Sequence, residues 1–153
     1  MKKDYFFVGV QLLLFALYIR EYQNWQFQSP DVLRIIAGIG AVGGTLLIGV
    51  ALFQLGAGLT PFPTPRDNGE LVRGGVFAFI RHPIYAGILG ATFGWALMQG
   101  SGWKLGIVVL LYGLFHFKSK YEEALLTAKF PDYEAYRKVT GRFFPKWSNP
   151  KTS

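Results

Sequence analysis

The chain has 153 residues, of which 51% are hydrophobic and only 16% are charged. Soluble domains average about 25% charged residues, so this composition is typical of a membrane protein. The length suits one domain, and the absence of cysteine excludes disulfides, thiolate metal sites and a cysteine nucleophile.

Four apolar segments follow one another along the chain, at residues 5–19, about 35–55, 84–103 and 105–117. The last is shorter than the roughly 17–25 residues that a membrane-spanning helix needs. Lys104 before it, and Lys118 and Lys120 after it, can lengthen this span by extending their side chains to the membrane surface. The sequence therefore predicts an all-α integral membrane protein with about four transmembrane helices.

The basic residues predict the orientation of these helices. The net charge is +7, with sixteen lysines and arginines. If both termini are cytoplasmic, only Arg20, Arg34 and Lys104 lie outside and thirteen of the sixteen lie inside, as the positive-inside rule expects. An odd number of spans would separate the basic N-terminus from the basic tail. We therefore expect cytoplasmic termini, and anionic lipid rather than nucleic acid as the partner of the surplus charge.

Two glycine patterns stand within the apolar segments. Residues 38–44, GIGAVGG, match the G-x-G-x-x-G fingerprint of dinucleotide-binding proteins. That fingerprint needs a strand before it and a βαβ unit around it, and the surrounding sequence has no strand pattern. Gly40 with Gly44, and Gly90 with Gly94, also form G-x-x-x-G pairs. We expect these glycines to let membrane helices approach closely.

Metal binding is not indicated. The chain has two histidines, His82 and His116, and no short-spaced histidine pair that would hold a metal ion together with a carboxylate. We therefore expect no metal site.

The stretch from 60 to 83 connects the second and third apolar segments. Pro61, Pro63 and Pro65 alternate in it, which favours extended backbone. Loops of this length are often functional or disordered, and a plain linker is the alternative interpretation.

Arg81, His82 and Pro83 stand at the start of the third apolar segment. Proline suits the first position of a helix, because its missing N–H is not needed there. The free N–H groups and the positive dipole end of that helix, with Arg81 beside them, suit a carboxylate or phosphate. The alternative is that Arg81 reaches lipid phosphate and His82 only caps the helix.

A second polar group lies at the end of the fourth segment. Tyr112, His116, Ser119 and Glu123 recur at helical spacing and should share one helix face, with Glu122 beside Glu123. Polar residues inside a span usually face the bundle interior or a cavity. A solvated, salt-bridged helix end is the alternative for the two glutamates.

A short helix is predicted after this segment. Pro131 can open it and Gly141 can follow it. Phe130, Tyr133 and Tyr136 recur every third residue along it, so we expect an interfacial helix at the membrane surface or over the site.

Three stretches together resemble the isoprenylcysteine carboxyl methyltransferase family. They are GLTPFPTPR, LVRGGVFAFIRHPIYAG and KYEEALLTAKFPDYEAYRKVTGRFFP, and they cover roughly residues 58–147 in the family's order. The signature is RHPxY followed about 35 residues later by Glu-Glu. The superfamily also includes the membrane phospholipid N-methyltransferases. The resemblance implies a single domain over 1–153, with two spans in 1–57 and the catalytic region in 58–147.

The resemblance also implies S-adenosylmethionine as cofactor, bound at the cytoplasmic face without a Rossmann domain. The family's cofactor motif falls on Arg81, His82, Pro83, Tyr85, Gly87, Glu122 and Glu123, and the polar helix face adds His116 and Ser119. The cofactor carboxylate suits the helix start, its ammonium suits Glu122 or Glu123, and its sulfonium suits the Tyr85 ring.

The expected reaction is methyl transfer to a lipophilic or membrane-embedded acceptor, similar to an isoprenylcysteine carboxylate. A carboxylate needs alignment but no base, and Arg142 or Arg73 would hold it. The alternatives are a phospholipid amine, for which His82, His116 or a glutamate would have to accept a proton, and a thiol.

Two further interpretations lie outside methyl transfer. One is an NADPH-dependent membrane reductase of the sterol type, with Arg66 and Arg73 at the 2′-phosphate. The second is a non-catalytic membrane binding protein.

Overall fold

The computed structural model describes residues 2–22, 25–56, 60, 62–64 and 71–146. Its helices are α1 (Lys2–Ile19), α2 (Asp31–Leu55), α3 (Pro83–Gln99), α4 (Gly102–Lys129) and α5 (Tyr133–Val139), with a 3₁₀ turn η3 (Gly75–Ala78) before α3. The described residues form no strand, only isolated bridges. The all-α prediction is confirmed for this part of the chain. The boundary at 57/58 lies outside the described residues, as do Pro61, Pro65 and Arg66.

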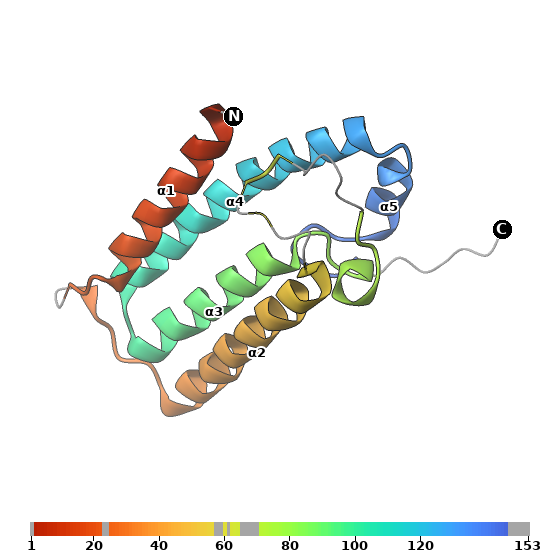
Figure 1. The fold of residues 1–153 in the computed structure, drawn as a ribbon. Coiled ribbons are helices and arrows are strands. Elements are labelled where there is room, and N and C mark those ends of the chain that lie inside the picture. The colour runs from red at the N-terminus through yellow and green to blue at the C-terminus, as the bar shows by residue number, and fades with distance from the viewer. Residues whose placement is uncertain (1, 23–24, 57–59, 61, 65–70, 147–153) are drawn as a thin grey trace.

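The helices pack in pairs, and glycines let one of these pairs approach closely. Figure 1 shows α2 and α3 side by side, and α1 beside α4. A methyl group added at Gly44 would lie 2.5 Å from the backbone nitrogen of Ala91, and one at Gly94 would overlap the carbonyl oxygen of Ala37. Glycine at these positions therefore allows α2 and α3 to pack backbone against backbone. Gly40 has nothing within 4 Å, so only Gly44 of that predicted pair serves this contact.

The helices found over the third and fourth predicted spans, α3 and α4, have different boundaries from those spans. The helix α3 ends at Gln99, because Gly100 takes a left-handed conformation with φ 64°. Ser101 then caps α4 by accepting a hydrogen bond from the Lys104 backbone N–H. The predicted end of the third span at residue 103 was therefore wrong. The helix α4 continues past the predicted end of the fourth span at residue 117, as far as Lys129, and the end of that span stays a prediction.

Two of the three lysines expected to reach the membrane surface are buried. Lys104 is 5% exposed and pairs with Glu21 at 3.0 Å, and Lys118 is 2% exposed and donates to Gln11 at 2.8 Å. Lys120 is exposed. The prediction for Lys104 and Lys118 was wrong, because each of them finds a polar partner on or just after α1.

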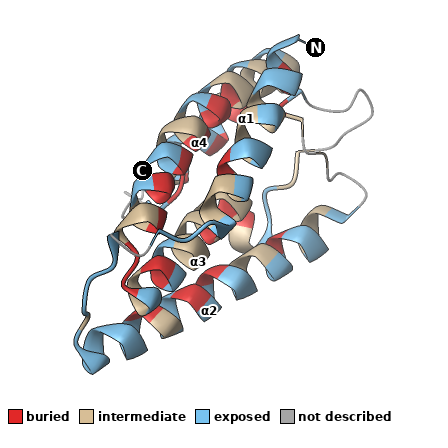
Figure 2. Ribbon diagram, turned by 90° about the vertical axis from the view of Figure 1, so that its left-hand side faces the viewer, coloured by how far each residue is buried: buried red, intermediate tan, exposed pale blue. Residues whose placement is uncertain are grey.

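Of the described helices, α2 alone is both long and apolar enough to cross a membrane, by length and composition. Only 11% of the residues in its most apolar 18-residue stretch are buried within the protein. Figure 2 shows the exposed residues of α1 and α2 on their outer sides and the buried residues where helices meet. Ile35, Ile39 and Phe53 are among the exposed apolar side chains of α2. Crossing by α1, α3 and α4 stays a prediction.

A small core joins α1 and α4 to the C-terminal segment. Leu14, Ile107, Leu111, Phe115 and Phe143 form one buried cluster. Phe143 follows α5 in the chain, so this cluster fixes the C-terminal segment beside the start of α3. The short helix predicted near residue 131 is confirmed as α5, which begins at Tyr133.

Candidate cofactor site

The corner at Arg81, His82 and Pro83 is held by the C-terminal segment. The backbone N–H of Arg81 donates to Gly141 at 2.8 Å, and that of His82 donates to Arg142 at 3.1 Å. Pro83 then begins α3, with no side-chain cap at His82. The first N–H groups of a helix have no intrahelical partner. Ile84 and Tyr85, in the first turn of α3, both line a cavity.

Glu123 on α4 ties three basic side chains together. Its carboxylate accepts hydrogen bonds from Arg81 Nε at 3.0 Å, from His82 Nε2 at 3.2 Å, and from Arg142 Nη2 at 3.0 Å and Nε at 3.3 Å. The Glu123 side chain is only 3% exposed. Burial alone would raise the pKa of Glu123, but the hydrogen bonds from His82, Arg142 and Arg81 outweigh burial and hold it below its ordinary value.

Glu122 has a different environment. It lines the cavity and is 26% exposed. The Tyr85 hydroxyl donates to Glu122 Oε2 at 3.0 Å, and His82 Nδ1 lies 3.7 Å from the same oxygen. Burial raises the pKa of Glu122 above its ordinary value, against the opposing effects of His82, Tyr85 and Lys118. Of the two glutamates, Glu122 is the one that lines the cavity.

Aromatic rings form one wall of the site. The ring of Tyr85 is nearly parallel to that of His82, at 5.4 Å between centroids, and to that of Phe115, at 4.7 Å. Lys118 Nζ lies 5.3 Å from the Tyr85 ring centroid. The Tyr85 ring thus already has aromatic and cationic neighbours, and the expected contact with a sulfonium stays a prediction.

The cavity itself has a volume of about 180 Å³. Its polar lining consists of Gln11, Thr60, Arg81, His82, Tyr85, Lys118 and Glu122, and its apolar lining of Leu55, Phe77, Pro83, Ile84 and Ile88. Pockets for small molecules usually measure roughly 300–1,000 Å³. The cavity formed by the described residues is therefore smaller than a usual small-molecule pocket.

Several predicted site residues lie outside the cavity lining. Gly87 faces α2, where an added methyl group would lie 2.7 Å from the carbonyl oxygen of Gly44. Ser119 is fully buried and donates to the His116 carbonyl, and the His116 ring lies against Tyr112 and Phe117. Arg73 pairs with Asp132 at 3.3 Å. Arg142 is paired with Glu123, at 3.0 Å, and does not line the cavity.

Sequence reasoning missed Lys118 and Gln11 as site residues. Lys118 stands four residues before Glu122, a spacing that places the two on one helix face. That spacing could have identified Lys118 as a neighbour of Glu122. Gln11 comes from a helix more than a hundred residues away in sequence, so no local pattern could have identified it.

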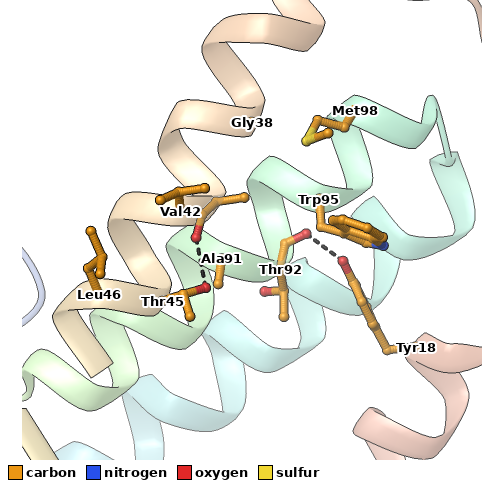
Figure 3. A pocket seen from close by; sticks show the side chains of 10 residues that line it. Tyr18, Gly38, Val42, Thr45, Leu46, Ala91, Thr92, Trp95 and Met98 are labelled. Atoms are coloured by element: carbon orange, nitrogen blue, oxygen red, sulfur yellow. Dashed lines mark hydrogen bonds between the residues drawn. The ribbon is translucent and has the colours of Figure 1, made fainter. Parts of the chain in front are cut away.

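A larger apolar groove lies between α1 and α2, with α3 beneath (Figure 3). It measures about 590 Å³ and is lined by Tyr18, Gly38, Ala41, Val42, Thr45, Leu46, Ala91, Thr92, Trp95 and Met98. Its hydroxyls are internally satisfied: Tyr18 donates to the Thr92 carbonyl at 2.6 Å, and Thr45 donates to the Ala41 carbonyl at 2.9 Å. The groove therefore presents an apolar surface.

No group of three potential metal ligands gathers among the residues that the structure describes.

Two relatives each match two thirds or more of this chain. The chain is 29% identical over 143 residues to the nickel-cobalt-cadmium resistance protein NccN of Alcaligenes xylosoxydans, a match over 92% of this chain and 63% of that protein. It is 28% identical over 104 residues to the cobalt-zinc-cadmium resistance protein CzcN of Cupriavidus metallidurans, a match over 67% of this chain and 48% of that protein. The chain thus spans about half to two thirds of the length of these relatives.

The sequence pattern of the phospholipid methyltransferase family matches residues 33–133. This range runs from α2 to the start of α5 and includes the corner before α3 and both glutamates of α4. The match confirms the resemblance stated from the sequence. The chain belongs to the phospholipid methyltransferase family, within the isoprenylcysteine carboxyl methyltransferase-like membrane superfamily.

Proposed function

We propose that this protein is a membrane-embedded methyltransferase that uses S-adenosylmethionine and acts on a lipophilic acceptor. The observation that carries the proposal is the pairing of opposite charges in one small cavity. Glu122 faces it from α4, while Lys118 and Arg81 line it beside the start of α3. A zwitterionic amino-acid group needs one partner of each sign, and this lining supplies both.

The chain's own residues would hold the cofactor by its two charged groups. Glu122 would bind the ammonium, and the N–H groups at the start of α3, with Lys118, would bind the carboxylate. When bound, S-adenosylmethionine supplies the methyl group and its sulfonium becomes a neutral thioether. The apolar wall of Phe77, Ile84 and Ile88 would exclude water from the reacting atoms.

The groove supports a lipophilic acceptor. Ile88 lines the cavity, and Thr92, one turn further along α3, lines the groove. Both spaces have walls from α1, α2 and α3. We infer that the apolar part of the acceptor lies in the groove and its nucleophile at the cavity, with the site facing the cytoplasm in a multi-pass protein.

Two acceptor chemistries have separate support. A carboxylate of the isoprenylcysteine type follows the sequence resemblance, and the methyl group would then pass to an anion with no proton to remove. A phospholipid amine follows the family match. An amine must lose a proton, and His82, which lines the cavity with its Nδ1 3.7 Å from Glu122 Oε2, is the candidate acceptor of that proton.

A membrane reductase has less support than a methyltransferase. Arg73, expected at a 2′-phosphate in a reductase, is paired with Asp132. The family match also favours methyl transfer over hydride transfer. The relatives are named for resistance to metals, and the described residues of this chain offer no cluster of metal ligands on which to base a metal-binding function.

The proposal is tested by following radioactive methyl groups from S-adenosylmethionine into lipids. Purified protein in mixed micelles would be given phosphatidylethanolamine or an isoprenylated N-acetylcysteine. We expect transfer to at least one of them, and loss of at least tenfold in rate for Glu122→Gln. Glu134→Gln, which removes a half-exposed carboxylate on α5, should keep the wild-type rate. Absence of transfer to either acceptor and to a total lipid extract would contradict the proposal.

A further inference from the structure

The two adjacent glutamates of α4 have different surroundings. Their side chains diverge because consecutive residues on a helix point about 100° apart. Glu123 is 3% exposed and turns toward the corner before α3 and the C-terminal segment. Glu122 is 26% exposed and turns toward the cavity. Only one of the two therefore borders the space where a ligand fits.

The carboxylate of Glu123 is already surrounded by N–H donors and lies outside the cavity lining. Its Oε1 accepts from Arg81, His82 and the Nε of Arg142, and its Oε2 accepts from the Nη2 of Arg142, all within 3.3 Å. A ligand ammonium would have to compete with these charge-assisted bonds, which are among the stronger hydrogen bonds in proteins. Glu122 accepts a single side-chain bond, from Tyr85, among those that the described residues show, at 3.0 Å.

The residues bonded to Glu123 connect α4 to the corner before α3 and to the C-terminal segment. Arg81 Nη1 also donates to the carbonyl oxygens of Arg137 and Thr140 at the end of α5. The backbone of Arg81 and His82 is bonded to Gly141 and Arg142. Glu123 therefore fixes the segment that immediately precedes Pro83, and with it the direction of the N–H groups at the start of α3.

We infer that the two glutamates divide the work of the site. Glu122 is the residue that contacts the ammonium of the cofactor, and Glu123 is a positioning residue that never contacts it. Glu123 acts through the corner at Arg81 and His82, which it holds so that the start of α3 receives the cofactor carboxylate. This division rests on the proposed function, because it takes S-adenosylmethionine as the ligand.

The test uses three ligands that differ by one charged group. They are S-adenosylhomocysteine, its deamino analogue and its decarboxylated analogue, titrated calorimetrically into detergent-purified protein. The wild type should prefer S-adenosylhomocysteine over each analogue by about tenfold or more, the range expected for one charge-assisted bond. Glu122→Gln should lose the preference for the amino group and keep the preference for the carboxylate.

Glu123→Gln should show the opposite pattern. It should keep the preference for the amino group and lose most of the preference for the carboxylate, because the start of α3 is no longer held in place. A merely structural role would weaken all three ligands by the same factor, and that result would overturn the positioning role. Glu134→Gln, the matched control on α5, should bind like the wild type.

A second variant covers the case in which Glu123→Gln does not fold. Arg142→Gln removes two of the four bonds to Glu123 from a side chain that is 28% exposed, and it should repeat the Glu123→Gln pattern more weakly. Loss of the amino preference in Glu123→Gln or Arg142→Gln, or its retention in Glu122→Gln, would overturn the inference and leave the proposed function standing. A folded wild type that binds none of the three ligands would overturn both.

Discussion

At the scale of single residues, the site consists of charges that are costly to bury and are therefore paired. Arg81 is 8% exposed, His82 5% and Glu123 3%. Removing one partner of such a buried pair leaves the other charge uncompensated, which usually costs about 3–5 kcal/mol. The Glu123 cluster is thus expected to be far more sensitive to substitution than the exposed Arg137–Glu134 pair.

This cluster should make stability depend on pH. The folded-state pKa of Glu123 lies below the ordinary value, so its stabilisation is complete above about pH 4.3, the usual glutamate pKa. The stabilisation is lost as the pH falls toward the folded-state pKa. The difference in melting temperature between wild type and Glu123→Gln should therefore shrink below about pH 4.3.

Thermal melts in detergent from about pH 7 to about pH 3, a range that brackets the ordinary glutamate pKa, would measure this difference. Glu134→Gln serves as the control, and its difference from wild type should stay small throughout. A gap between wild type and Glu123→Gln that widens toward low pH would contradict the pairing of Glu123.

Two buried tyrosines on α5 allow a second comparison. The Tyr136 hydroxyl donates to the Phe77 carbonyl at 2.5 Å, whereas the Tyr133 hydroxyl has no hydrogen-bond partner among the described residues. Burial raises the pKa of Tyr136 to about 12, so the phenol stays protonated and able to donate at neutral pH. Tyr136→Phe should lower the free energy of unfolding by about 1–3 kcal/mol, because a buried carbonyl loses its partner.

Tyr133→Phe should be neutral or slightly stabilising, since it removes a hydroxyl that makes no bond to the described residues. Chemical denaturation of both variants beside the wild type would measure the two effects. Equal losses in the two variants would contradict the different environments of the two hydroxyls.

The sequence predicted part of the cavity lining at this scale, but not its internal arrangement. Arg81, His82, Tyr85 and Glu122 were predicted and do meet at one cavity. The assignment of Glu123 as bonded to the corner rather than open to ligand depends on side-chain directions, which a motif does not contain. Lys118 looked like a surface lysine because its partner Gln11 is remote in sequence.

At the scale of elements, helix contacts are set by glycine and helix ends by local chemistry. The approach of α2 to α3 at Gly44, Gly87 and Gly94 leaves no room for a side chain. The sequence predicted such contacts from paired glycines. It could not distinguish Gly44 from Gly40, because both lie in the same motif and only the packing of α3 separates them.

Substitution of these two glycines tests the helix contact. Gly44→Ala places a methyl group 2.5 Å from backbone and should destabilise the protein by about 1–3 kcal/mol. Gly40→Ala, with nothing within 4 Å, should be neutral or stabilising by up to about 1 kcal/mol. Thermal melts in one detergent would compare them, and equal effects would contradict the close approach of α2 and α3 at Gly44.

The length of α4 illustrates what composition misses. Its 28 residues extend about 42 Å at 1.5 Å per residue, longer than the roughly 30 Å hydrocarbon core of a bilayer. The uncharged residues predicted the span, and the spacing of Tyr112, His116, Ser119 and Glu123 predicted that the helix continues beyond it, because charge marks the end of a span but not the end of a helix. The charged end of α4 instead carries Glu122 and Glu123 to the site.

At the scale of the whole molecule, the apolar outer side of α2 and the basic segments expected in the cytoplasm favour a protein embedded in a bilayer. The absence of cysteine in the chain makes its orientation directly measurable. Gln28→Cys, in the exposed connection between α1 and α2, should react with an impermeant maleimide in intact cells. Lys138→Cys, on α5, should react only after the membrane is opened.

Labelling of both positions from the same side of the intact membrane would contradict the arrangement with both termini in the cytoplasm. The sequence predicted about four spans. Among the described helices, length and composition support a span for α2 alone.

Binding of the methyl donor at the cavity between α3 and α4 is the property on which the proposed function depends. Calorimetric titration of detergent-purified wild type with S-adenosylhomocysteine and, separately, with NADPH tests it most directly. We expect micromolar binding of S-adenosylhomocysteine, at least tenfold weaker in Glu122→Gln, and no binding of NADPH. Binding of NADPH alone, or of neither ligand by folded protein, would contradict it.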